Sequence, residues 1–207
     1  MKLSRIFIIE SWMYVEAYEM AAAFHQIFDD RKPKEPTPFM LQEAIFRQGF
    51  KLEELIELLH VTADGDNQAF EEACLAMHQV IEQTKEKILK KEATQKVSVQ
   101  TISKEVNATD DLTILTQQVD ALVDLLYFTY GSFVLLGVDP KPILEIVHQA
   151  NLGKLFPDGK PHYDPVTHKV LKPADWAQRY APEPKILAEL KRQIALAQEK
   201  QQSDLLQ

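Results

Sequence analysis

The sequence predicts an all-α fold: a bundle of four to five helices, then an irregular segment and a final helix. Apolar residues recur at three- and four-residue spacing, as Leu52, Leu55, Ile56 and Leu59 do in one run. Proline and glycine punctuate these runs at a few places, and Gly137 suits the end of one helix. Strand signals are nearly absent, apart from a short pair expected around residues 168–171.

The first half of the chain predicts three helices. Ser11 is expected to cap a helix that runs to about Phe28, and the prolines of residues 31–38 make a connector. Thr37 is expected to cap a second helix from Pro38 to about Val61, with Gly49 as a candidate kink. A turn with a helix cap at residues 64–67 leads to a third helix over residues 68–91.

The second half predicts a polar connection and three more helices. Residues 92–107 are expected to be a flexible loop or an insertion, because their apolar residues are scattered. Helices are expected over residues 111–136, 140–151 and 184–201. The segment between the last two, residues 152–182, is expected to be irregular but ordered, because it carries Phe156, Tyr163 and Trp176.

Composition limits the classes of protein. The chain has 207 residues, 45% of them hydrophobic, which fits one domain with elaborations or with a small appendage. A formal net charge of −8 argues against binding to nucleic acid polymers, so polyphosphate ligands would need metal ions as mediators. The single cysteine, Cys74, cannot form an internal disulfide, which favours the cytoplasm.

No membrane segment is expected. The apolar run from Ile6 to Ile9 is too short for a signal peptide, and Glu10 ends it. The run Leu125–Val138 is too short to cross a bilayer comfortably and predicts a buried core helix instead.

Two aspartates in an apolar helix are the most informative feature for function. Asp120 and Asp124 lie one turn apart in a run that is apolar nearly all the way round. Two carboxylates in a low-dielectric interior repel each other, so a divalent cation with oxygen ligands is expected between them. The alternative is that one aspartate pairs with an arginine while the other faces water.

A second acidic cluster comes earlier, at Glu53, Glu54 and Glu57. Taken alone, three glutamates on one helix face are usually a solvated surface. Together the two clusters supply up to five carboxylates, and ligation by carboxylates without Cys or His favours Mg²⁺, or Mn²⁺, over zinc.

These clusters resemble a known family. The spacing Glu-Glu-x-x-Glu followed by Asp-x-x-x-Asp-x-x-Tyr, ending at Tyr127, is similar to the all-α nucleotide pyrophosphohydrolases: MazG, dimeric dUTPases and phosphoribosyl-ATP pyrophosphohydrolase. The resemblance runs from about Phe24 to Pro173, excluding roughly residues 62–109. One departure is that Ala121 occupies the place of the usual glutamate, so that Asp120 substitutes for it. Three later motifs resemble those of a MazG-like branch: His148-x-x-Asn151-x-x-Lys154, Asp158-Gly159-Lys160 and Lys169-x-x-Lys172-Pro173.

The resemblance implies a MazG-like bundle over residues 1–152 with an insertion at about 62–109, an irregular segment near the substrate at 153–183 and a C-terminal helix at 184–207. It also implies Mg²⁺-dependent hydrolysis of a nucleoside triphosphate to a monophosphate and pyrophosphate, in a homodimer or homotetramer. The metal ligands would be Glu54, Glu57, Asp120 and Asp124, and Glu53 would be a further ligand or would orient the attacking water. Residues expected near the substrate are Arg47, Tyr127, Asn151, Lys154, Lys160 and Lys172.

Several alternatives stay open. A lysine of this set is either a phosphate contact or an ordinary solvated residue, and Arg47 either clamps phosphate or balances the carboxylates. His148 is expected to pack rather than to catalyse, and Tyr127 either stacks on a base or belongs to the core. The chain as a whole could instead be a non-catalytic helical module, or act on phosphoribosyl-ATP or dUTP.

Overall fold

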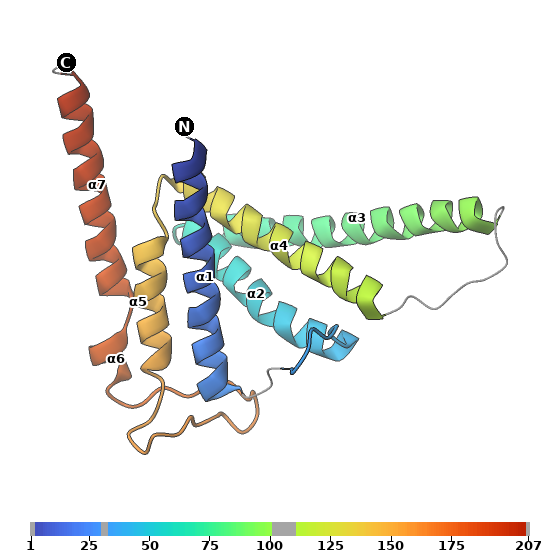
Figure 1. The fold of residues 1–207 in the computed structure, drawn as a ribbon, viewed down its shortest axis with the longest axis horizontal. Coiled ribbons are helices and arrows are strands. Elements are labelled where there is room, and N and C mark those ends of the chain that lie inside the picture. The colour runs from blue at the N-terminus through green and yellow to red at the C-terminus, as the bar shows by residue number, and fades with distance from the viewer. Residues whose placement is uncertain (1–2, 30–32, 101–110, 206–207) are drawn as a thin grey trace. The chain divides into compact units, whose positions relative to one another are not determined.

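The chain is helical, and its helices fall into two compact units. The computed structural model describes residues 3–29, 33–100 and 111–205, and this part contains no strand. One unit comprises Met1–Glu35 and Ala121–Gln207, and the other comprises Pro36–Asp120. The all-α prediction is confirmed. The helices are α1 (Leu3–Phe28), α2 (Leu41–Thr62), α3 (Asn67–Gln100), α4 (Asp111–Leu136), α5 (Lys141–Leu152), α6 (Trp176–Tyr180) and α7 (Glu183–Leu205) (Figure 1).

In the first unit α5 packs against both α1 and α7. The rings of Phe24 and Phe28 stack with centroids 4.4 Å apart, and Phe28 is buried, as the sequence predicts for this face. Tyr163, from the segment after α5, donates its hydroxyl hydrogen to the Phe28 carbonyl oxygen at 2.7 Å. This contact ties the irregular segment to the end of α1.

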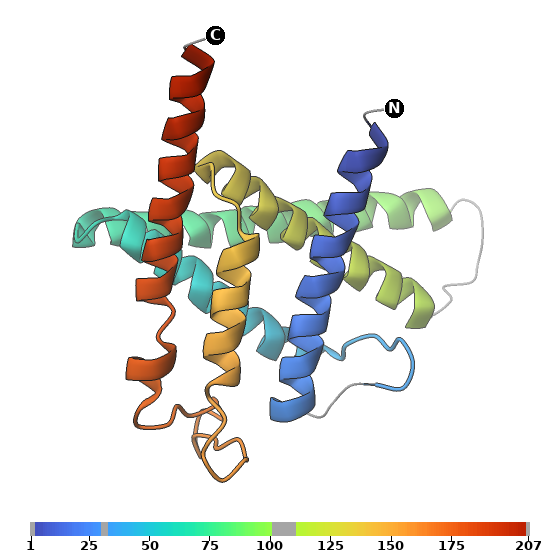
Figure 2. The ribbon, with the colours of Figure 1, turned by 60° about the vertical axis from the view of Figure 1, so that its left-hand side comes forward.

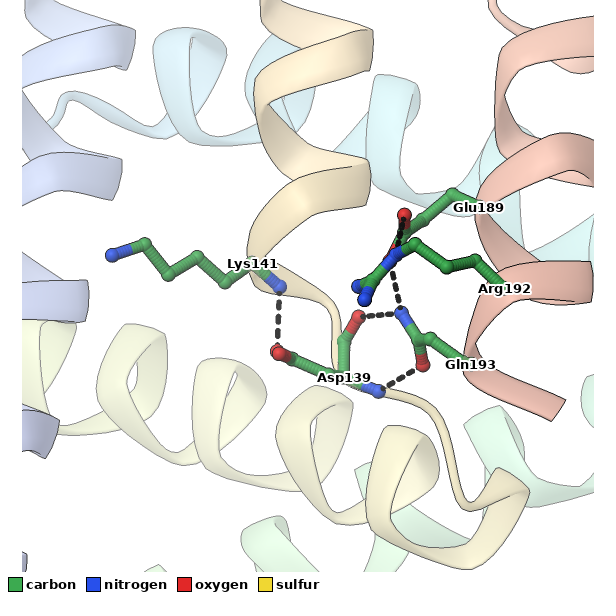
Figure 3. Close-up of polar contacts among 5 residues, drawn as sticks. All are labelled: Asp139, Lys141, Glu189, Arg192 and Gln193. Atoms are coloured by element: carbon green, nitrogen blue, oxygen red, sulfur yellow. Dashed lines mark hydrogen bonds and ion pairs between the residues drawn. The ribbon is translucent and has the colours of Figure 1, made fainter. Parts of the chain in front are cut away.

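The junction of α5 and α7 is held by a polar network (Figure 3). The Gln193 side chain donates to the Asp139 carbonyl oxygen at 3.0 Å and accepts from the Asp139 amide at 2.9 Å. Arg192 donates to both carboxylate oxygens of Glu189, at 2.6 and 2.7 Å. The Arg192 hydrogen bonds and then one from Gln193 lower the pKa of Glu189 to about 2.

In the second unit α2 packs against α3. The ring of His60 meets that of Phe70 edge-on, with centroids 5.1 Å apart. Between the helices Asp64 and Gly65 adopt positive φ, and the Asp66 carboxylate accepts from the Ala69 amide at 3.0 Å. The predicted turn with a helix cap is therefore confirmed.

Two predicted helix starts are wrong. The helix α1 begins at Leu3 rather than after Ser11, because its first residues continue the helical pattern. The helix α2 begins at Leu41, with Met40 and not Thr37 at its N-cap. The reason is that Phe39 forms two hydrogen bonds with the Gln118 side chain. The Phe39 amide donates to Gln118 Oε1 at 2.8 Å, and Gln118 Nε2 donates to the Phe39 carbonyl oxygen at 2.9 Å. Those two bonds hold Phe39 in extended chain outside the helix.

Other boundaries differ in instructive ways. Gly49 lies in an unbroken helix. The helix α3 continues to Gln100, past the expected stop at residue 91, and Lys90 pairs with Glu86 at 3.3 Å one turn away on its surface. The rest of the expected loop, residues 101–107, lies outside the described residues. The strand pair is confirmed only as an isolated bridge between Tyr163 and Val170, and the short α6 was not expected.

The helix α4 has its predicted bounds, and Gly137 ends it with a φ of +69°. The prediction that α4 is a buried core helix is wrong for the single chain, because no residue of it is buried and Leu135 is 91% exposed. Within the part of the chain described, α4 is the helix long and apolar enough, by length and composition, to cross a membrane. The core helix of a folded protein passes the same test.

Candidate active site

The helix α2 presents the first acidic cluster. Glu53, Glu54 and Glu57 are exposed, while Ile56 and Leu59 are half-buried on the same helix. This division follows the 3.6-residue period, which turns the glutamates away from the residues that pack. Glu54 and Glu57 therefore keep their carboxylates available for a ligand.

Four of the predicted metal ligands have uncompensated charge. Glu54, Glu57, Asp120 and Asp124 form no ion pair or side-chain hydrogen bond with any other residue the structure describes. The alternative in which an arginine neutralises one aspartate therefore receives no support. The donor chemistry, four free carboxylates, fits a hard divalent cation.

The described residues do not bring these donors together into a metal-binding group. Across residues 3–29, 33–100 and 111–205, no three Asp, Glu, His or Cys side chains come together in a group that could hold a metal ion. The glutamates and Asp120 belong to the second unit, and Asp124 belongs to the first. Within the second unit, the described glutamates and Asp120 do not form a metal-binding group.

Two cations precede the acidic cluster on α2. Arg47 and Lys51 lie one turn apart, and Lys51 donates to the Gln48 side-chain oxygen at 3.2 Å. Burial, and then the charge of Arg47, lower the pKa of Lys51 below its ordinary value. Lys51 was missed at the sequence level, although its spacing from Arg47 is a readable signal for a paired cationic site.

Trp176 organises the predicted substrate residues after α5. Its indole is 8% exposed, and its Nε1 donates to the Ala150 carbonyl oxygen at 2.8 Å. The Lys172 ammonium lies 4.1 Å from the indole centroid, a cation–π distance. Ala150 is the residue before Asn151, so Trp176 holds Lys172 close to the end of α5.

Gly153, after α5, lies too close to α6 for any residue with a side chain. A β-carbon added at Gly153 would lie 2.4 Å from the Tyr180 ring, and only a residue without a side chain allows that approach. Lys154 follows directly, and its amide donates to the Asn151 carbonyl oxygen at 3.1 Å. The structure thus brings Asn151, Lys154 and Lys172 to one end of the first unit.

Lys160 lies in a separate tight turn. Its amide donates to the Asp158 carboxylate at 3.0 Å, and Gly159 takes a φ of +74°. His162 Nε2 lies 2.8 Å from the other Asp158 oxygen, and its ring stacks on Phe156 at 4.0 Å. The bond from His162 and then the one from Lys160 lower the pKa of Asp158. The Lys160 side chain itself is exposed.

The remaining predicted residues have plainer surroundings. Tyr127 is 75% exposed and meets Phe128 edge-on, so its core role does not hold in the single chain. His148 is half-buried on α5, as the packing interpretation expects. Trp176 was expected only as a mark of order in residues 152–182, and its contacts with Ala150 and Lys172 were not predicted. The bond between Gln118 and Phe39 was not predicted either.

These features fit the class of all-α nucleotide pyrophosphohydrolases, with acidic residues on α2 and α4 and lysines in the segment after α5. The chain belongs to the phosphoribosyl-ATP pyrophosphohydrolase family, whose model matches residues 21–151. It is also similar to a solved structure from Exiguobacterium sp. 255-15 named "putative NTP pyrophosphohydrolase". The two are 34% identical with a TM-score of 0.72, over 87% of this chain and 97% of that one. No curated protein matches the chain.

The predicted family, fold class and enzyme class are therefore confirmed. The chain is a pyrophosphohydrolase that acts on nucleotides. The interpretation as a non-catalytic helical module is set aside on the same findings. The metal, the residues of the site and the division at residues 152 and 183 stay predictions.

Proposed function

We propose that the protein hydrolyses a nucleoside triphosphate at the α–β phosphoanhydride, with Mg²⁺ as its cofactor and Mn²⁺ as a substitute. A water oxygen bonds to the α-phosphorus, the bond from that phosphorus to the α–β bridging oxygen breaks, and pyrophosphate leaves. The products are a nucleoside monophosphate and pyrophosphate. The observation that carries the proposal is the set of four uncompensated carboxylates in a chain of this family.

Glu54, Glu57, Asp120 and Asp124 would hold the metal. When bound, the ion would neutralise phosphate oxygens and lower the pKa of a water molecule. Glu53 is assigned to orient the attacking water and to accept its proton, because it adjoins Glu54 on an exposed face of α2. Glu54 would contribute to the attack of the water as a metal ligand next to Glu53.

The cationic residues would bind the polyphosphate. Trp176 orients Lys172 through the cation–π contact, and the end of α5 places Asn151 and Lys154 nearby. Lys160 is exposed on its own turn and would add a point charge. On α2, Lys51 beside Arg47 gives a second cationic position that a phosphate would stabilise.

A second substrate is favoured by one finding. The matching family is described as phosphoribosyl-ATP pyrophosphohydrolase, and that nucleotide carries the same α–β bond. The chemistry proposed above would apply to it unchanged. A panel of substrates therefore has to include it beside the nucleoside triphosphates.

The test is pyrophosphate release from this panel with Mg²⁺, compared between the wild-type protein and Glu57→Gln. We expect metal-dependent release from at least one nucleotide and a loss of about 100-fold in the variant. Release of single phosphate would show that a different bond is cut, and no release from any nucleotide would refute the proposal.

We also propose that the protein works as a homodimer or homotetramer in the cytoplasm. The apolar side chains that α4 leaves exposed support assembly, because a large apolar surface is costly in water. Light scattering at micromolar concentration should show the oligomer, and a monomer would contradict this part of the proposal.

A further inference from the structure

The chain contains two Asp-Gly pairs, and the structure surrounds them differently. Asp64–Gly65 lies in the turn that joins α2 to α3 in the second unit (Figure 1, Figure 2). Asp158–Gly159 lies in the turn after α5 in the first unit. In an Asp-Gly pair the backbone nitrogen attacks the preceding side-chain carboxyl group most readily, because glycine has no side chain to hinder it. The two pairs therefore have the same intrinsic reactivity, and only their surroundings distinguish them.

The pair in the turn between α2 and α3 is open to this attack. Asp64 and Gly65 are both exposed. Neither the Asp64 carboxylate nor the Gly65 amide forms a hydrogen bond with any residue that the structure describes. The neighbouring Asp66 carboxylate, by contrast, accepts from the Ala69 amide at 3.0 Å. The Gly65 nitrogen can therefore reach the Asp64 carboxyl carbon without breaking an existing bond.

The pair after α5 is closed to the same attack. The Gly159 amide donates to the Phe156 carbonyl oxygen at 2.9 Å, so its nitrogen is engaged. The Asp158 carboxylate accepts from the Lys160 amide at 3.0 Å and lies 2.8 Å from His162 Nε2. The bond from His162 and then the one from Lys160 lower the pKa of Asp158, and an ionised carboxylate is a poor electrophile. Attack at Asp158 would require these bonds to break first.

We infer that Asp64 is a modification site at which isoaspartate forms spontaneously, and that the fold protects Asp158 from the same reaction. The Gly65 nitrogen bonds to the Asp64 side-chain carboxyl carbon. The bond from that carbon to its hydroxyl oxygen breaks, and water leaves with the proton of the nitrogen, which gives a cyclic succinimide. A water molecule then opens the ring. Attack at the side-chain carbonyl restores aspartate, and attack at the backbone carbonyl leaves isoaspartate, whose chain passes through the former side chain.

Isoaspartate at residue 64 would alter the turn between the helices. It adds a methylene group to the backbone and turns the former backbone carboxyl of Asp64 into a free carboxylate. The Asp66 amide donates to the Ala63 carbonyl oxygen at 2.9 Å, and this bond encloses the altered linkage. The Asp66 carboxylate also caps α3 at Ala69. The modification should therefore loosen the connection of α2 to α3.

The test is to age the purified native protein at physiological temperature and mildly acidic pH, and then to digest it. Electron-transfer mass spectrometry, which distinguishes isoaspartate from aspartate, measures the fraction of isoaspartate at residues 64 and 158. We expect at least about 10-fold more at residue 64, because Asp158 reacts only after its hydrogen bonds have opened.

The same chain unfolded in urea is the matched control. Both Asp-Gly pairs then lose their surroundings and should form isoaspartate at similar rates. Asp64→Glu is a second control, because glutamate would have to close a larger ring. This variant should form no modified residue at position 64 and should leave the small yield at Asp158 unchanged. Circular dichroism confirms that the variant is folded.

Equal fractions of isoaspartate at the two positions of the native protein would overturn the inference, as would none at residue 64. A preference for residue 64 that persists in urea would also overturn it, because the fold would then not be its cause. Neither metal nor nucleotide enters the measurement, so the result is independent of the proposed function.

Discussion

The two units of the chain differ in how they are stabilised. The buried residues among those described, namely Phe28, Ala150, Gly153 and Trp176, all lie in the unit of α1, α5, α6 and α7. The unit of α2 and α3 has none, and its apolar side chains are exposed or half-buried. The first unit thus has a small core of its own, whereas the described residues of the second unit have none.

The largest effect should come from the core of the first unit. Trp176→Ala removes the indole packing, the bond to Ala150 and the platform for Lys172, and should lower the free energy of unfolding by about 3–5 kcal/mol. Urea denaturation measures the loss. Trp176→Phe is the matched control, because it keeps an aromatic ring and should cost less. Equal stability of all three proteins would show that this unit has no such core.

Substituting alanine for two glycines should change the stability of the protein in opposite directions. Gly153 has a φ of −63°, which any residue adopts, so Gly153→Ala should destabilise by about 1–3 kcal/mol only through its clash with Tyr180. Gly49 lies in α2 with nothing within 4 Å of an added β-carbon. Gly49→Ala should therefore stabilise by about 0.5–1 kcal/mol. Thermal denaturation of both variants measures the two changes in stability. Changes of the same sign would contradict the account.

The two glutamines that each bind a backbone amide and carbonyl sharpen the comparison. Gln193→Leu should cost about 1–2 kcal/mol of stability and leave Mn²⁺ affinity unchanged, because it joins α7 to the residue before α5 and contacts none of the candidate ligands. Gln118→Leu loses the same two kinds of bond but frees the start of α4. It should weaken Mn²⁺ binding about 10-fold, measured by titration calorimetry. Equal Mn²⁺ affinities in the two variants would show that Gln118 does not position Asp120 for the metal.

The smallest expected effect is that of Glu189 on the pH dependence of stability. Because the pKa of Glu189 is lowered from 4.5 to about 2, its ionised form stabilises the folded state above about pH 4.5. That contribution is lost as the pH falls from about 4.5 towards 2. The melting temperature of the wild type should therefore fall more steeply over this range than that of Glu189→Gln. Parallel curves would mean that Arg192 and Gln193 do not stabilise the carboxylate.

Local sequence patterns predicted the helices well, and tertiary contacts account for most of the errors. The bounds of α4 followed from its apolar run and from Gly137, both of which are local signals. The start of α2 could not be predicted, because Gln118 binds Phe39 from 79 residues away. The burial of α4 was inferred from its composition, which shows that the helix needs covering but not which chain covers it.

The acidic residues of the candidate site were predicted from their spacing, the apolar context of the aspartates and the family resemblance, but their arrangement was not predicted. One-turn spacing shows that Asp120 and Asp124 share a helix face, and the family match confirms the class of enzyme. Which of these carboxylates lie near one another depends in part on the direction of residues 111–120 relative to α2. That direction is set by contacts between distant residues, which a sequence without structure does not display.

The most direct test is a crystal structure of the protein with Mg²⁺ and a non-hydrolysable nucleoside triphosphate. The account predicts an ion held by Glu54, Glu57, Asp120 and Asp124, with the polyphosphate beside it. Carboxylates directed into solvent with no ion among them would contradict it.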